Sequence, residues 1–193
     1  MITIVSGLPR SGTSLMMQML DCGGMPVLTD NVRNADENNR RGYFEYEKVK
    51  GLQSDNKWVE EAEGKAVKII AQLLPYVPRT FQYSVIYVIR PIEQVIASQQ
   101  KMLNNLEQQG AKLTIEQLTN VYSAQTRRAQ NWLMVSKIKT LFVFYPEVLS
   151  SPAEKAREIQ SFLGLDLDVE KMASVVDSSL WHQGKNEINI QEK

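Results

Sequence analysis

The chain has 193 residues, with 22 Lys plus Arg against 22 Asp plus Glu, so its formal net charge is zero. Binders of nucleic acid or of anionic membranes usually carry a basic surplus, which argues against both classes. A single cysteine and a single histidine exclude a disulfide framework and argue against a Cys-based or multi-histidine metal centre, so no metal is expected. The length and a hydrophobic content of 43% predict one globular domain over residues 1–193.

The first predicted element is a strand at Ile2–Val5, directly after the first methionine. This position leaves no room for a signal peptide, so we expect a cytoplasmic protein. Apolar runs elsewhere, such as Val85–Ile89, are too short to cross a bilayer, so no membrane span is expected.

A helix is predicted next, over Thr13–Cys22, because its apolar residues recur at helical spacing before Gly23. Within it, Met16, Met17 and Met19 are expected to fill the core, and Cys22 to be buried at the helix end.

The rest of the chain alternates short β-branched runs with longer helical patterns, which indicates βαβ units and an α/β fold with a central parallel sheet. Three further strands are expected, at Ala66–Ile70, Ser84–Ile89 and Thr140–Phe144, and helices at Ile92 to near Gly110, Thr114–Leu133 and Ser151–Leu163. The last two helices each begin with a predicted capping box, Thr114 with Gln117 and Ser151 with Glu154.

The strongest functional signal is the segment Ser6-Gly-Leu-Pro-Arg-Ser-Gly-Thr-Ser14, which lies between the first strand and the first helix. Its glycines permit a tight turn whose N–H groups, with the helix N-terminus, can bind an anion. It resembles a P-loop, but Thr13 stands where the nucleotide-binding lysine belongs, which weakens an ATPase or kinase interpretation. A kinase with a degenerate loop and a non-catalytic nucleotide-binding module remain the alternatives.

Three stretches resemble the sulfotransferases that use 3′-phosphoadenosine 5′-phosphosulfate (PAPS). Pro9-Arg-Ser-Gly-Thr-Ser-Leu15 is similar to their 5′-phosphosulfate loop. Arg90 follows an apolar strand and Ser98 lies eight residues later, the spacing with which that family holds the 3′-phosphate. Phe144-Tyr-Pro-Glu-Val, running on to Phe162-Leu-Gly-Leu165, resembles the closing strand and helix of the family.

The resemblance implies a P-loop-type, three-layer αβα domain that binds PAPS without a metal ion and transfers its sulfuryl group to a hydroxyl or amine. Arg10 would stabilise the charge that develops on the leaving oxygen, because arginine stays protonated. The residues expected to bind the donor are Pro9, Arg10, Ser11, Gly12, Thr13, Ser14, Arg90 and Ser98.

The acceptor must lose a proton to a general base, and two carboxylates compete for that role. Asp30 lies near the position where the protein-tyrosine sulfotransferases carry their Glu base. Glu45, in Arg41-Gly-Tyr-Phe-Glu45, matches a Gly-aromatic-aromatic-Glu segment of many bacterial relatives. Lys68 lies in a strand predicted to be central, where lysine is unusual, and the family often places a lysine there near the donor or acceptor.

The acceptor itself is expected to be a small molecule or a carbohydrate. Its pocket would come from residues 24–64, from residues 100–139, or from a second subunit in a homodimer. The polar tail, residues 183–193, is expected to be flexible.

Overall fold

A computed structural model describes residues 1–30, 32, 42–105 and 113–177 of the chain. Within them, four strands form an all-parallel sheet in the order β2-β1-β3-β4. The strands are β1 (Ile2–Gly7), β2 (Ala66–Lys68), β3 (Tyr83–Ile89) and β4 (Lys139–Phe144). Parallel strands end at the same edge of a sheet, so their carboxyl ends gather the loops that follow them.

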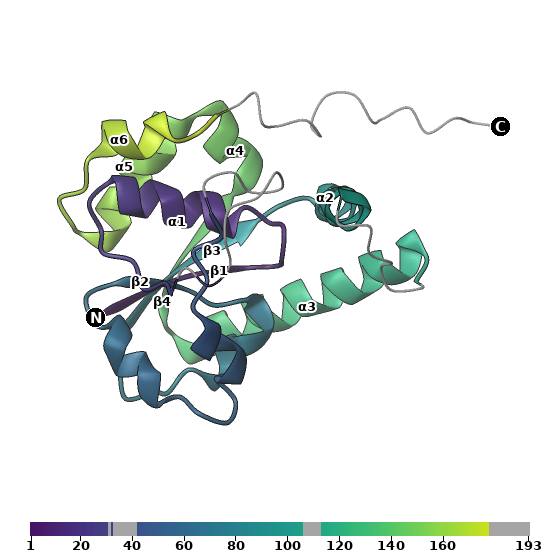
Figure 1. Cartoon of the computed structure of the whole chain (residues 1–193), viewed down its shortest axis with the longest axis horizontal. Coiled ribbons are helices and arrows are strands. Elements are labelled where there is room, and N and C mark those ends of the chain that lie inside the picture. Colours follow the sequence, from purple (N-terminus) through teal and green to yellow (C-terminus); the bar gives the residue numbers. More distant parts are fainter. Residues whose placement is uncertain (31, 33–41, 106–112, 178–193) are drawn as a thin grey trace.

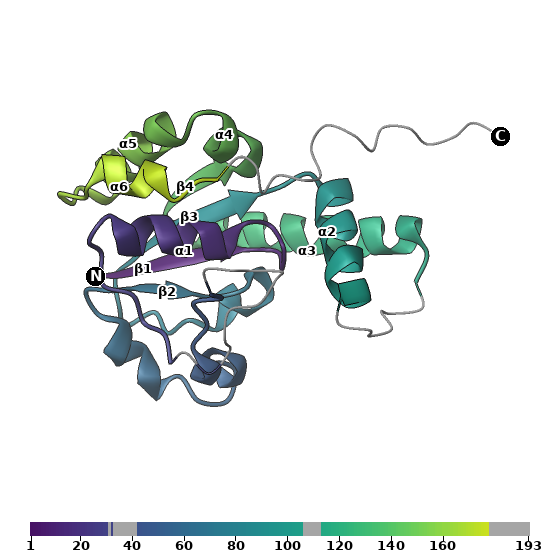
Figure 2. The same ribbon diagram turned by 45° about the horizontal axis from the view of Figure 1, so that its top comes forward.

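Helices cover both faces of this sheet, which confirms the expected α/β fold with a parallel sheet between helical layers (Figure 1). One face carries α1 (Thr13–Cys22), α4 (Tyr145–Ser150), α5 (Pro152–Leu163) and α6 (Val169–Ser174). The other carries α3 (Ile115–Ser136) and three short 3₁₀ helices, η1 (Glu47–Gly51), η2 (Lys57–Ala62) and η3 (Ala71–Tyr76). Figure 2 shows α2 (Ile92–Asn105) beyond the carboxyl ends of the strands.

Two apolar clusters, one on each face of the sheet, hold the layers together. Leu20 and Met17 of α1 are fully buried and belong to the cluster that also takes in α5 and α6. Trp58 and Leu133 belong to the opposite cluster, beneath the 3₁₀ helices and α3. The prediction that the α1 methionines fill the core is confirmed.

Three local predictions were wrong. Cys22 is exposed, because Gly23 takes the inward position at the helix end, where an added Cβ would lie 2.6 Å from Met172 Cγ. The capping box expected at Ser151 does not form: its side chain makes no cap hydrogen bond, and its N–H, which Glu154 would accept in such a box, donates to the carbonyl of Glu147 at the end of α4. Strand β2 was expected to be central but lies at the edge of the described sheet. It ends at Lys68, two residues before the predicted end at Ile70.

The remaining local predictions are confirmed where the structure describes them. Thr114 and Gln117 form the reciprocal capping box at the start of α3. Pro152 begins α5, and Gly164 ends it in the left-handed conformation. His182 and the tail at 183–193 lie outside the described residues. None of the helices described is both long enough and apolar enough to cross a membrane.

The core beneath α1 gives a first prediction. Leu20→Ala should lower the free energy of unfolding by about 2–5 kcal/mol, because it leaves a cavity in a packed layer. Val135→Ala, a control at an 81% exposed position of α3, should change it by less than about 0.5 kcal/mol. Urea denaturation followed by circular dichroism measures both, and equal effects would contradict the assignment of this layer as core.

Candidate functional site

The loop between β1 and α1 runs over the carboxyl ends of the strands, and Gly7 lets it turn there. Gly7 is paired with Val88 in the β1–β3 register. A Cβ at Gly7 would lie 2.7 Å from the carbonyl oxygen of Val88 and 2.5 Å from Ser11 Oγ. No larger residue fits without moving backbone, so β1 and β3 can approach closely where the loop begins.

Gly12 places the end of the loop on the ring of Tyr145. Its φ of 105° is in the left-handed region, and an added Cβ would lie 2.2 Å from Tyr145 Cδ2. Tyr145 follows β4 directly, just as Arg90 follows the end of β3. Its role as a support for the loop was not predicted, although a polar aromatic residue at the end of a parallel strand was a signal for it.

Arg90 contacts Arg10, Gln94 and Tyr145. Its Nη1 donates to the carbonyl oxygen of Arg10 at 3.0 Å, and its Nε donates to Gln94 Oε1 at 3.3 Å. Its guanidinium carbon lies 4.7 Å from the ring centroid of Tyr145. Burial lowers the pKa of Arg90, and the nearby charge of Arg10 lowers it further, while Tyr145 acts in the opposite direction. Two guanidinium groups that disfavour each other's charge form an arrangement that an anion stabilises.

Arg10 links the other two predicted donor residues. Its backbone adopts a φ of 69°, which is unusual for a residue with a Cβ. Its Nε donates to the buried Ser98 Oγ at 3.1 Å, and its carbonyl accepts from Arg90. Eight residues of helix rise separate Arg90 from Ser98 by roughly 12 Å. Arg10 contacts both of them, since its side chain bonds to Ser98 and its carbonyl bonds to Arg90.

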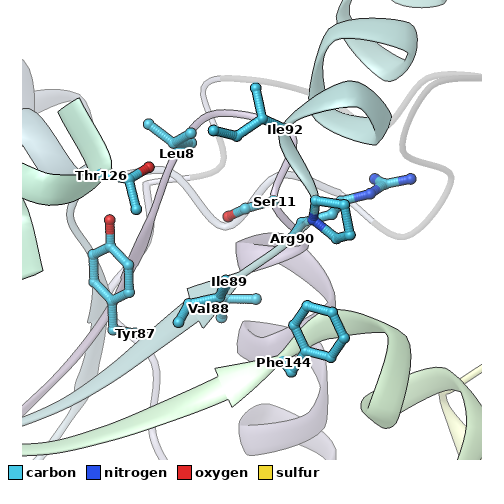
Figure 3. Close-up of a pocket in the computed structure, with 10 residues that line it drawn as sticks. Leu8, Ser11, Tyr87, Val88, Ile89, Arg90, Ile92, Thr126 and Phe144 are labelled. Carbon is cyan, nitrogen blue, oxygen red and sulfur yellow. The ribbon is translucent and has the colours of Figure 1, made fainter. Parts of the chain in front are cut away.

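The remaining loop residues take different positions. Thr13 and Ser14 form the first turn of α1, where Gly12 provides no side-chain cap. The first N–H groups of a helix lack intrahelical acceptors, so this turn offers donors to an anion. Pro9 is exposed, and the N–H of Ser11 closes the turn by donating to the carbonyl of Leu8 at 3.1 Å. The Ser11 side chain points toward the space between Leu8 and Tyr87 (Figure 3).

A second polar cluster lies on the β2 side of α1. Lys68 Nζ donates to the carbonyl oxygen of Tyr43 and, at 3.4 Å, to Ser14 Oγ. The same ammonium lies 3.5 Å from Glu45 Oε1, and the Lys68 side chain is only 8% exposed. Lys68 and Glu45 are therefore brought together beside the first turn of α1, so one of the two candidate bases lies next to the loop between β1 and α1.

Asp30, the other candidate base, binds backbone instead. Its Oδ2 accepts from the N–H of Glu47 at 2.5 Å and its Oδ1 accepts from the N–H of Val32 at 3.1 Å. The hydrogen bond from Glu47, followed by that from Val32, lowers the pKa of Asp30 against the effect of burial. A carboxylate whose two oxygens are occupied by backbone donors is a weak proton acceptor.

No group of three or more His, Cys, Asp or Glu side chains suited to a metal ion occurs in the described part of the chain.

A family model described as "Sulfotransferase domain" matches residues 2–191. The structure is similar to that of mouse sulfotransferase SULT7A1 complexed with PAP, with a TM-score of 0.56 and 16% identity. The match covers 90% of this chain and 62% of the mouse chain, so this chain spans less than two thirds of that protein.

Two bacterial structures are also similar. The sulfotransferase domain of the Synechococcus PCC 7002 olefin synthase has a TM-score of 0.56 and 17% identity, with 100% of this chain and 83% of that chain covered. A sulfotransferase from Alicyclobacillus acidocaldarius has a TM-score of 0.51 and 12% identity, with 86% and 83% covered. At these identities the likeness shows the fold alone. A search of curated protein sequences finds no match.

The contact between Arg90 and Tyr145 gives a second prediction. In a double-mutant cycle, Arg90→Met and Tyr145→Leu should show a coupling of about 0.5–2 kcal/mol, because a half-buried cation lies over the ring. Tyr145→Phe keeps the ring face and should retain most of the coupling with Arg90. Urea denaturation of the four proteins of each cycle measures it, and additive effects would show that the contact contributes no stability.

Proposed function

Because this chain belongs to the sulfotransferase domain family, we propose that it transfers a sulfuryl group from PAPS to a hydroxyl or amine of a small acceptor. The observation that carries the proposal is the meeting of Arg10, Arg90 and Ser98 at the start of α1. The family resemblance assigns these residues to the donor, and they are far apart in the sequence. Two arginines beside the first N–H groups of a helix form an arrangement that suits an anion.

The residues fit a donor with two phosphorylated ends. Arg90 and Ser98 would hold the 3′-phosphate, and the N–H and hydroxyl groups of Thr13 and Ser14 would hold the phosphosulfate. Gly12 would let that group approach the backbone, while Pro9 and Ser11 shape the turn. PAPS, when bound, supplies the sulfuryl group.

Arg10 would stabilise the charge on the leaving oxygen. As the acceptor atom bonds to sulfur, the bond from sulfur to the bridging oxygen breaks, and adenosine 3′,5′-bisphosphate leaves with that electron pair. The guanidinium of Arg10 remains protonated, so it offers charge and hydrogen bonds and does not act as an acid. Fixed donors of this kind provide electrostatic stabilisation without a metal ion.

Glu45 is the general base that the geometry favours. It would accept the proton that the acceptor hydroxyl or amine loses, and Lys68 would hold it beside Ser14. Asp30 accepts one backbone hydrogen bond from Glu47 at the start of η1 and another from Val32, so we assign it a structural role. Residues 24–64, which include Glu45, would form part of the acceptor side of one domain over residues 1–193.

Donor binding gives a third prediction. By calorimetry, adenosine 3′,5′-bisphosphate should bind without Mg²⁺ and more tightly than ADP or ATP. Arg90→Ala should weaken it by about ten- to a hundredfold, the effect of losing a charge-assisted hydrogen bond. Arg79→Ala is the matched control, because Arg79 is exposed and precedes the opposite end of β3. Preference for ATP with Mg²⁺ would favour a kinase and refute the proposal.

The choice of base gives a fourth prediction. With an acceptor found by screening alcohols, phenols and amines against ³⁵S-labelled PAPS, Glu45→Gln should lower kcat by about 10²–10⁴-fold. Asp30→Asn should keep kcat near its original value but lower the melting temperature, because an amide NH₂ cannot accept a backbone N–H. Bisphosphate affinity should be unchanged in both variants. Full turnover in Glu45→Gln would rule out this assignment.

A further inference from the structure

Strand β4 is an edge strand, and its outer side has no neighbouring strand among the described residues. The sheet ends at β4, which pairs with β3 alone. This pairing runs without a bulge through six consecutive positions, from Lys139 to Phe144. A regular edge of this kind presents a row of backbone N–H and C=O groups that another strand can bind.

Strand β4 lacks the features that usually protect an edge from a second strand. A charged side chain, a proline or a bulge commonly blunts a natural edge. The one charged residue of β4 is Lys139, and its ammonium is bound by α5. It donates to the carbonyl oxygen of Phe162 and lies 4.8 Å from the centroid of the Phe162 ring. The charge of Lys139 is therefore directed toward its own helical layer.

Two large aromatic side chains of this edge strand are exposed. Phe142 is 42% exposed and Phe144, at the end of the strand, is 40% exposed (Figure 3). Side chains alternate between the two faces of a strand, so both rings lie on the same face of the sheet. On that face Phe142 meets the ring of Tyr87 at a centroid distance of 5.8 Å. Exposed apolar residues beside an unpaired edge indicate an interaction surface.

The charges at the two ends of β4 have opposite signs. Lys137, which precedes the strand, is exposed. Beyond the other end, Lys155 forms ion pairs with Glu147 at 2.6 Å and with Glu158 at 2.8 Å. Two carboxylates around one ammonium leave a net negative charge. The start of one β4 strand therefore complements the end of another β4 strand that runs in the opposite direction.

We propose that this edge binds β4 of a second copy of the chain, antiparallel across a two-fold axis, so that the two sheets become one. Opposed residues of antiparallel strands point to the same face, so the axis passes through a residue and not between two. An axis at Phe142 brings Lys137 to the level of Glu147 of the partner subunit, because each lies five residues from Phe142. The two Phe142 side chains then face each other as a cross-strand aromatic pair.

The mass of the full chain in solution is the first test. Sedimentation velocity, without PAPS or an acceptor, should show twice the mass of one chain at about 10–100 μM, because specific interfaces of standard size bind in the μM range or more tightly. Phe142→Lys places two like charges on the axis and should give a monomer. Val135→Lys is the matched control and should stay dimeric, because Val135 is an exposed apolar residue of α3 outside the strand.

A disulfide test locates the axis. Cys22 is the single cysteine of the chain, so Cys22→Ser provides a background without a thiol. In that background Phe142→Cys should form a disulfide between subunits on mild oxidation, because facing Cα atoms of antiparallel strands lie about 4.5–5.5 Å apart. Thr140→Cys should form none, because the two copies of Thr140 would lie four residues apart along the strands, about 13 Å.

The proposal fails if the chain stays monomeric at about 100 μM. Protection of the β4 amides from hydrogen exchange in such a monomer would show that another segment covers the edge. The proposal also fails if a dimeric chain forms no disulfide through Phe142→Cys, because a different surface would then join the subunits. If circular dichroism shows that Phe142→Lys does not fold, the disulfide test with its Thr140→Cys control decides the matter.

Discussion

The parallel register between β1 and β3 is the constraint on which the site depends. It sets Gly7 level with Val88, so the donor loop leaves β1 next to the point where Arg90 follows β3. A slip of one residue would move Arg90 by about 3.3 Å and exchange the faces of the strand. Its bond to the carbonyl of Arg10 and its stacking on Tyr145 would both be lost. Burial along the whole of β1 and nearly all of β3 fixes the register, so the hydrophobic core determines the geometry of a polar site.

Helix α1 connects two chemically different halves of the site. On its β3 side, Gly12 rests on Tyr145, and the arginines gather beside it. On its β2 side, Ser14 contacts Lys68, which pairs with Glu45. In the proposed reaction, donor binding and proton removal would therefore share one rigid support, a single helical turn in which neighbouring residues face opposite sides. Such sharing positions groups from distant parts of the chain without long side chains or a metal.

The sequence correctly predicted those features that depend on a single strand, turn or helix. Glycines at a strand-to-helix turn predicted the loop, and polar residues after apolar strands predicted the position of Arg90. The contact of Arg10 with Ser98 could not be foreseen, because it depends on a left-handed backbone that residues other than glycine rarely adopt. Asp30 and Glu45 could not be ranked either, since their difference lies in which backbone N–H groups and which lysine reach them after folding. The missing cap at Ser151 and the exposure of Cys22 could not be predicted for the same reason, because each depends on contact with another helix.

The uncapped first turn of α1 has a consequence for the lifetime of the protein. Gly12 provides no side chain to satisfy the N–H groups of that turn, so an anion bound there completes the helix as a capping residue would. A ligand that binds the folded chain alone shifts the balance against unfolding by an amount that grows with the logarithm of its concentration. Proteases and chaperones act on the unfolded fraction, so the abundance of the protein would rise with the supply of any anion that binds at this turn.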